Sequence, residues 1–285
     1  MGMRFAVLAA AGLVLGAGLP LTGQTDCNGA GAGPLRTVAS EWDQFRDVLA
    51  KAVANDAAFK AARIHYAYDQ DFMVQTLGQT GDGQFRPNGE LHQTAEVHFD
   101  EHGRRIEHVT YSPQNTLRRL TLEPEDLTDI FEVSAFPIPA DRLSEYTVVF
   151  AGRQRVDELE TYVFDITPKT IDKRKRYFQG RIWVDADDKV IVKSCGKSVP
   201  DVVSTGKRDL LGRPKRVIES LHPTYVTYRQ QVDGKYWFPA YTRSDDVLQF
   251  RNGDLRLHEI LKCRNYRAAG GLSEAGKKEQ TSPPQ

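Results

Sequence analysis

Cysteine, net charge and catalytic motifs are scarce or missing in this sequence of 285 residues. No two of its 3 cysteines have the spacing of zinc ligands, which excludes a structural zinc site. The 38 Lys and Arg balance 38 Asp and Glu, which argues against the basic surface of a nucleic-acid-binding protein. GxSxG, HExxH, Walker and GxGxxG motifs are missing, so we assign no catalytic residue, no metal ligand and no cofactor.

The longest apolar run lies at the amino terminus. Arg4 precedes an unbroken stretch of apolar and small residues from Phe5 to Leu19, and Pro20 and Gly23 follow it. This is the plan of a secretory signal peptide, and the run is shorter than the about 20 apolar residues of a membrane span. We therefore expect a cleaved signal peptide at residues 1–23 and an exported protein; the alternative is an uncleaved anchor.

Composition divides the rest of the chain into a leader, one domain and a tail. Residues 24–36 are rich in Gly and Ala, as in a flexible leader, and residues 268–285 carry the Gly, Lys and Pro of a disordered tail. A single domain is expected at residues 37–267. Because an oxidising compartment allows disulfides, Cys195 and Cys263 could form a bridge if their strands are neighbours, and the sequence leaves the connectivity open.

Helical spacing of apolar residues occurs near the start of this domain. Trp42, Phe45 and Leu49 recur every three to four residues, which predicts one amphipathic helix that Asn55 and Asp56 interrupt or cap. A second, short helix is expected at residues 123–131.

Beyond about residue 63 the period of the apolar residues falls to two, which predicts β-strands. The expected strands are 72–77, 90–99, 104–111, 146–153, 159–167, 177–185, 189–195, 223–232, 235–245 and 255–266. Asn88-Gly89, Asp233-Gly234 and Asn252-Gly253 supply the positive φ angles of tight hairpin turns. An antiparallel sheet of this many strands must curl or close. The fold class expected is therefore mainly β: a large curved antiparallel sheet whose hollow the amphipathic helix partly fills.

Short aromatic motifs in these strands carry a resemblance to a known family. Residues 162–168 (YVFDITP), 178–185 (FQGRIWVD) and 190–193 (VIVK), with 225–239 further on, resemble the LolA-like superfamily of periplasmic lipoprotein carriers, outer membrane lipoprotein-sorting proteins and their relatives. The resemblance covers roughly residues 146–266. It implies a periplasmic protein with an unclosed half-barrel, a short helical lid over the concave face, and an apolar cavity that shields acyl chains from water.

The resemblance also implies a site and a function. The candidate cavity-lining residues are Trp42, Phe45 and Leu49 from the helix and Phe164, Ile182 and Val184 from the strands. The alternative is that these six form a packed core. We expect a monomeric, non-enzymatic carrier or binding protein for lipid or lipoprotein acyl chains. It needs no cofactor, does not bind nucleic acid, and has an inner- or outer-membrane protein as its candidate partner.

Two further functions stay open. The same sheet could bind a protein partner in envelope-stress signalling, as in RseB-like relatives. A metal-dependent envelope hydrolase would use His92, His98, His102 and His108, but histidines of turns and exposed strands are commonly solvated. The basic runs 173–176 and 207–216 are expected to be solvated loops; as functional sites they would suit phospholipid head groups.

Overall fold

The computed structural model describes residues 25–29, 31–37, 42–208, 214–219, 222–250 and 252–269. The expected signal peptide over 1–23 lies outside these ranges, and so does the expected tail over 268–285 except for residues 268 and 269, the first of which ends β12. The helical elements are α1 (Trp42–Arg63), α2 (Pro124–Thr128), the π-helical turn η1 (Asp129–Val133) and the 3-10 turn η2 (Ala140–Glu145). The strands are β1 (Tyr66–Gln79), β2 (Phe85–Phe99), β3 (Arg105–Tyr111), β4 (Tyr146–Val156), β5 (Leu159–Pro168), β6 (Tyr177–Asp185), β7 (Ile191–Val199), β8 (Val202–Arg208), β9 (Pro214–Glu219), β10 (Tyr225–Val232), β11 (Tyr236–Leu248) and β12 (Leu255–Ala268).

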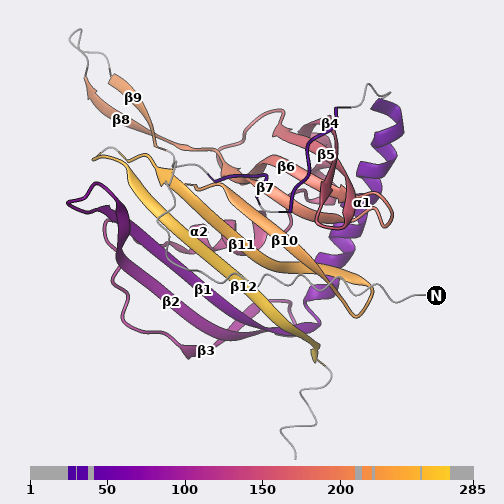
Figure 1. The fold of residues 1–285 in the computed structure, drawn as a ribbon, viewed down its shortest axis with the longest axis horizontal. Coiled ribbons are helices and arrows are strands. Elements are labelled where there is room, and N and C mark those ends of the chain that lie inside the picture. Colours follow the sequence, from indigo (N-terminus) through magenta and orange to yellow (C-terminus); the bar gives the residue numbers. More distant parts are fainter. Residues whose placement is uncertain are drawn as a thin grey trace, which may run out of the picture.

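Ten of the strands in the described part of the chain form one antiparallel sheet (Figure 1). Their order is β3-β2-β1-β12-β11-β10-β7-β6-β5-β4, so the first strand lies beside the last in the middle of the sheet. The chain runs outward to the edge strand β3, crosses to the opposite edge at β4, and returns strand by strand to β12. β3 and β4 are the two edges, and the sheet is not closed. The expected fold class, a large unclosed antiparallel sheet with few helices, is confirmed.

One face of the sheet carries both helical covers. A row of directly paired residues crosses nine strands, and paired residues of antiparallel strands point to the same face. The row is Gln93, Phe72, Leu261, Thr242, Thr227, Ser194, Ile182, Phe164 and Phe150. At one end Phe131 of η1 meets Phe72 with ring centroids 5.6 Å apart, and at the other Phe45 of α1 stacks on Phe150 at 3.9 Å. We call this the inner face.

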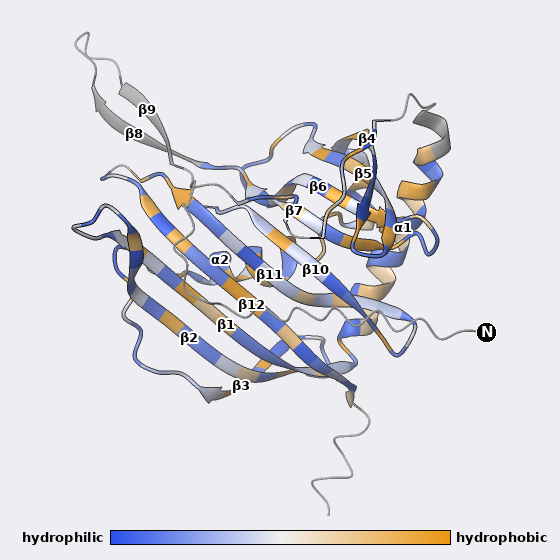
Figure 2. Ribbon diagram, in the orientation of Figure 1, coloured by the Kyte–Doolittle hydropathy of each residue, from blue (hydrophilic) through white to orange (hydrophobic). Residues whose placement is uncertain are grey.

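Alternation along the strands separates the inner face from the outer one. In β1 the buried Phe72 and Val74 alternate with the more exposed Asp71 and Met73. Figure 2 shows apolar and polar residues alternating in the same way along β1, β2 and β12. Each inward apolar side chain can then contact α1 or the segment that crosses the inner face, which is how the two-residue period of the sequence becomes a core.

Helix α1 is continuous through Asn55 and Asp56 and ends at Arg63, so it has no break there. The Asp56 carboxylate accepts a hydrogen bond from the Arg229 guanidinium of β10, and both side chains are buried. A helical interior position disfavours Asp in a peptide, but here the ion pair with the sheet compensates for that preference.

The cysteine pairing differs from the expected one. Cys27 of the leader forms the disulfide with Cys195 of β7, and Cys263 is a free, buried thiol. The Cys195–Cys263 prediction is wrong because β7 and β12 are separated by β10 and β11 in the sheet, so the two cysteines lie on strands that are not neighbours.

The described part of the leader is held against the sheet, in contrast to the flexible segment expected from its glycines. Residues 32 and 36 form antiparallel bridges with Val156 and Arg153 of the edge strand β4. The amide of Gly33 donates to the carbonyl of Arg155 at 2.9 Å, and the Lys193 ammonium donates to the carbonyl of Asn28 at 2.9 Å. The backbone bonds to residues 153, 155 and 156 cover part of the β4 edge, which otherwise has unpaired amides and carbonyls.

The turn predictions have mixed outcomes. Asp233 and Gly234 have φ angles of 52° and 65°, as a tight hairpin between β10 and β11 requires. Asn88-Gly89 is not a turn: it lies inside β2 at a register shift, where a Cβ on residue 89 would be 2.4 Å from the carbonyl oxygen of Thr116. The segment 207–216, expected to be a loop, includes the end of β8 and the start of β9, which form a two-stranded pair.

Candidate functional site

Residues 112–145, which connect β3 to β4 and include α2, η1 and η2, cross the inner face; we call them the lid segment. A capping box starts α2, in which the Glu123 amide donates to the Asp126 carboxylate at 2.8 Å and the Glu123 carboxylate accepts from the amide of residue 126. Pro124 fits the first helical turn because its missing N–H has no partner there. The short helix expected at 123–131 is thus present, but it changes to a π-helical turn at Asp129.

Two buried charged contacts fix the second half of the lid segment. Arg229 donates to the carbonyl of Ala135 at 2.6 Å in addition to its bond with Asp56, so one guanidinium joins sheet, helix and lid segment. Arg63, at the end of α1, donates to the Glu132 carboxylate at 2.9 Å. These contacts are costly to break because Arg63 and Arg229 are buried cations, which would lose a partner.

The residues predicted to line an acyl-chain cavity are found in the packed core. Phe45 and Leu49 of α1 and Phe164, Ile182 and Val184 of the sheet belong to one cluster of buried side chains. The ring of Phe150 fills the space beside Phe45. The side chain of Trp42 lies outside the described residues. Five of the six predicted residues therefore lie together in a packed core, as the alternative interpretation expected.

A cavity lies elsewhere on the inner face, beneath the first half of the lid segment. It has a volume of about 300 Å³. Its lining consists of Leu120, Thr121, Leu122, Glu123, Glu125, Asp126, Asp129, Arg176, His222, Pro223, Tyr225, Leu248, Phe250 and Glu259. The leucines and Phe250 make one wall apolar, whereas acidic side chains of the lid segment and of β12 supply the polar groups. We call it the lid cavity.

Asp129 and His222 are buried in this cavity, and the partly exposed Arg176 contacts both of them, with an ion pair to Asp129 at 3.6 Å. The Asp129 and His222 side chains are 2% and 4% exposed. Arg176 Nη1 lies 2.6 Å from His222 Nε2, and an arginine can only donate, so Nε2 accepts and the proton of the neutral ring is on Nδ1. His222 Nδ1 is 3.1 Å from Asp129 Oδ2, but the geometry is not that of a hydrogen bond. Among the described residues, no hydrogen bond reaches either Asp129 carboxylate oxygen.

Glu259 of β12 is the second buried acid of the lid cavity. Burial is the main cause that raises the pKa of its carboxyl from 4.5 to about 7, against a hydrogen bond with Tyr225 that lowers it. Burial likewise raises the pKa of the Tyr225 hydroxyl well above 10. Within the described part of the chain, Oε2 of Glu259 has no hydrogen-bond partner. Near neutral pH this carboxyl can therefore exchange a proton with a ligand or with water.

This arrangement can orient a ligand, and Glu259 can exchange a proton with it. A histidine that acts as a general base needs a free ring nitrogen facing the substrate, and Arg176 occupies Nε2 of His222. Thr121 and Tyr225 supply the hydroxyl groups of the lining. What the cavity does offer is hydrogen-bond acceptors next to apolar side chains, which is the usual composition of a binding site for a small amphiphile.

The four histidines of the β2–β3 hairpin do not form a site. His92 contacts the Asp71 carboxylate at 2.9 Å, and His102 is an exposed turn residue beside Glu101. Over the described ranges, no three His, Cys, Asp or Glu side chains are grouped so that they could hold a metal ion.

Sequence reasoning overlooked Glu259, although a signal for it is present. Leu255, Leu257, Leu261 and Cys263 occupy alternate, buried positions of β12, and Glu259 lies in the same register. An acid in an apolar series of inward positions indicates a buried functional group, because a buried charge is unfavourable without a partner. His222 and Asp129 gave no comparable signal, since one lies in a loop and the other follows a short helix.

No protein-family model matches the chain, and no curated protein matches it. Among solved structures, the chain is similar to a DUF1329 family protein from Desulfovibrio piger, with 13% identity, 80% of this chain and 98% of that chain covered, and a TM-score of 0.34. It is also similar to MucB in the MucA/MucB complex of Pseudomonas aeruginosa, with 11% identity, 75% and 94% covered, and a TM-score of 0.23.

The described sheet is antiparallel and unclosed, and α1 and the lid segment lie on one of its faces, as the sequence analysis expected. As for membranes, no helix within the described ranges is both long and apolar enough to span a bilayer.

Proposed function

We propose that this protein is a non-enzymatic, periplasmic binding protein that holds the acyl chain of a lipid or lipoprotein in the lid cavity. The observation that supports this proposal is the lid cavity itself, in which an apolar wall faces carboxylates that are buried and incompletely hydrogen-bonded. The acyl chain is placed beneath the lid segment and not between α1 and the sheet, because side chains fill the latter space.

The size of the cavity sets the strength of binding. A volume of about 300 Å³ is at the lower end for ligand pockets, so it covers part of a chain and not a whole lipid. Burial of about six methylene groups would contribute roughly 5 kcal/mol, which corresponds to a dissociation constant below 1 mM but above 1 μM. Such an affinity suits a protein that must release its cargo.

The polar group of the ligand should be a hydrogen-bond donor. Five carboxylates line the cavity against one arginine, which pairs with Asp129 at 3.6 Å. Among the described residues, Oε2 of Glu259 and Oδ1 of Asp129 accept no hydrogen bond. A hydroxyl or an ammonium group on the ligand would donate to these oxygens, whereas a carboxylate on the ligand would bring another negative charge into a buried site.

The test compares two single-chain probes with the same tail. Full-length protein purified without detergent is stripped of lipid and titrated calorimetrically with decylamine and with decanoate at pH 7. Decylamine should bind more tightly than decanoate by about tenfold or more, since a hydrogen bond to a charged group contributes about 1.5–3 kcal/mol.

A matched pair of variants locates the binding. Leu122→Trp fills the cavity from the lid segment and should abolish binding, whereas Leu127→Trp makes the same change at a half-buried lid residue outside the lining. Equal loss in both variants, or no saturable binding of either probe together with no lipid in native mass spectra, would overturn the proposal.

A second function, recognition of a protein partner, is favoured by the edge strand β3. Three large side chains are exposed there: Ile106 (39%), Val109 (45%) and Tyr111 (51%). An edge strand with free backbone groups can accept a further strand. Capture of one stoichiometric partner that survives removal of lipid, and is lost in Val109→Lys, would support this function; capture that depends on lipid would refute it.

A further inference from the structure

A second cavity follows the lid cavity along the lid segment. It has a volume of about 240 Å³, and Arg176 lines both cavities. Its floor is apolar and rigid, because Phe136, Tyr146 and Phe178 are buried at 6%, 4% and 1% exposure. The two cavities have opposite polar linings, since carboxylates predominate in the first and cations in the second.

Four cations from three parts of the chain meet at the second cavity. Lys60 comes from the last turn of α1, Arg142 from η2, and Lys175 and Arg176 from the connection between β5 and β6. The one carboxylate in the lining, Glu132, is held by Lys60 at 2.7 Å and by Arg63 at 2.9 Å. The lining is therefore positively charged even when Glu132 is ionised.

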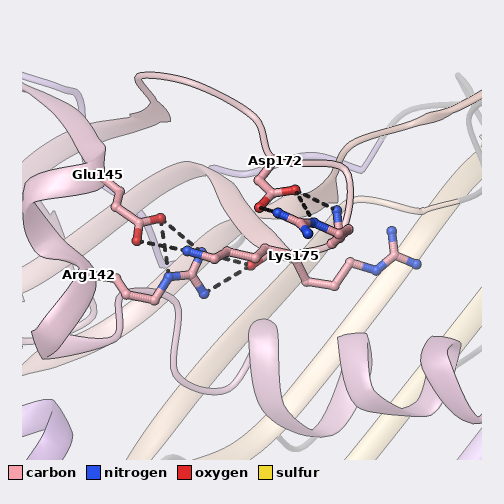
Figure 3. Close-up of polar contacts among 6 residues, drawn as sticks. Arg142, Glu145, Asp172 and Lys175 are labelled. Atoms are coloured by element: carbon pink, nitrogen blue, oxygen red, sulfur yellow. Dashed lines mark hydrogen bonds and ion pairs between the residues drawn. The ribbon is translucent and has the colours of Figure 1, made fainter.

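Neighbouring groups hold these cations in place while leaving them able to bind an anion. The Arg142 guanidinium lies 4.5 Å from the centre of the Tyr177 ring and donates to the carbonyl of Arg176 at 3.3 Å. The Glu145 carboxylate pairs with Arg142 at 3.3 Å and with Lys175 at 3.4 Å. Figure 3 shows these contacts. Glu145 lies outside the lining, and such long, partly exposed ion pairs contribute little, so an anion in the cavity can replace them.

We propose that this second cavity binds the phosphate group of a phosphate-bearing ligand. A phosphate carries a charge of about −1.5 to −2 and three acceptor oxygens, and an arginine fork can bond two of them at once. The aromatic floor would contact whatever apolar part is attached to the phosphate. Both a phospholipid head group and free phosphate present this chemistry, and the experiment separates them.

The experiment uses the full chain and two soluble probes. Sodium phosphate and dihexanoyl phosphatidic acid are titrated calorimetrically at pH 7 and low salt. If the ligand is a lipid head group, the lipid binds and inorganic phosphate does not; if it is free phosphate, inorganic phosphate binds at least as tightly. In either case added sodium chloride weakens binding, because it screens the cations.

Neighbouring residues of one loop provide matched variants. Lys175→Gln removes a lining cation, and Arg174→Gln removes a cation whose side chain is 89% exposed and paired with Asp172. Lys175→Gln and Arg142→Gln should weaken binding about fivefold or more, and Arg174→Gln less than twofold. Lys175 is itself 48% exposed, so this variant keeps the test valid even if Arg142→Gln does not fold.

Two results would overturn the inference: neither probe binds, or Arg174→Gln weakens binding as much as Lys175→Gln, which would indicate diffuse surface charge. The inference does not require an acyl chain in the lid cavity. Leu122→Trp should bind the phosphate probe like the unmodified protein, so failure of the acyl-chain proposal and failure of this one give different results.

Discussion

Replacement of Glu259 by glutamine should stabilise the protein, and the gain should grow with pH. Glu259 is buried in the lid cavity, and burial is the main cause that raises the pKa of its carboxyl to about 7. Asp126 and Asp246 raise the same pKa, whereas the Tyr225 hydrogen bond and His258 lower it. A glutamine at this position would keep the shape of the side chain and accept the Tyr225 hydrogen bond without a charge.

The magnitude follows from the difference between the folded and unfolded pKa values. An acid whose pKa is raised on folding binds more protons in the native state, so its contribution to the free energy of unfolding is complete below pH 4.5 and is lost as pH rises to about 7. A shift from 4.5 to about 7 corresponds to roughly 3 kcal/mol. This is the upper limit of the advantage of Glu259→Gln at pH 8.

Urea denaturation at several pH values between 5 and 8 measures this advantage. The free energy of unfolding of Glu259→Gln minus that of the unmodified protein should rise through this range and level off above pH 7. Glu101→Gln, at a glutamate with an 87% exposed side chain, is the control and should show no such rise. A difference for Glu259→Gln that stays constant with pH would refute the view that this carboxyl is desolvated.

Three other predictions test the contacts that place the site. Asp56→Asn should lower the free energy of unfolding by about 3–5 kcal/mol in urea denaturation, because it leaves Arg229 buried without its counter-charge. The double variant Asp56→Leu with Arg229→Met should recover part of this loss, the remainder reflecting the lost bond to the Ala135 carbonyl. No recovery would contradict this reason. Dithiothreitol should lower the free energy of unfolding of the unmodified protein by about 2–5 kcal/mol, because the Cys27–Cys195 bridge links residues that are 168 positions apart in the sequence. The Cys27→Ser variant should show no response to the reductant. An equal response in both proteins would count against the pairing. Arg119 of the lid segment donates to the carbonyl of Gly253 at 2.7 Å. Arg119→Ala should therefore speed the release of decylamine roughly two- to tenfold in stopped-flow measurements, with little change in the free energy of unfolding. An unchanged rate would show that the lid segment does not open there.

Local patterns predicted several strands well. β12, whose burial alternates over its first nine residues, begins at the expected residue and extends two residues further than expected. β6 has the bounds expected from its apolar and aromatic residues, although its burial does not alternate. The Asp233-Gly234 turn is also local, since both of its residues have the positive φ angles that such a turn needs. These features depend on neighbours in sequence, which is why periodicity and turn residues identify them.

Features that depend on distant partners were not predictable in the same way. The carbonyl of Thr116 comes within 2.4 Å of where a Cβ on Gly89 would be, so that glycine serves a close approach inside β2 and not a turn. Cys27 pairs with Cys195 of β7, and leader residues further along the chain bridge to the edge strand β4. No pattern in a Gly-rich segment indicates this arrangement. The lid cavity joins residues from the lid segment, β10, β11 and β12, and only the alternation around Glu259 marked it in the sequence.

The lid segment is held unequally along its length, and this suggests how a ligand could enter the lid cavity. Its second half is fixed by buried groups: Ile130 is 1% exposed, Ser194 donates to the carbonyl of Ser134 at 3.1 Å, and Arg229 donates to that of Ala135 at 2.6 Å. Its first half is held by exposed bonds such as that of Arg119 to the β11–β12 turn. Exposed hydrogen bonds exchange with water at small net free energy, whereas buried ones do not. Opening at residues 112–123 would therefore uncover the cavity while the core beneath α1 stays packed.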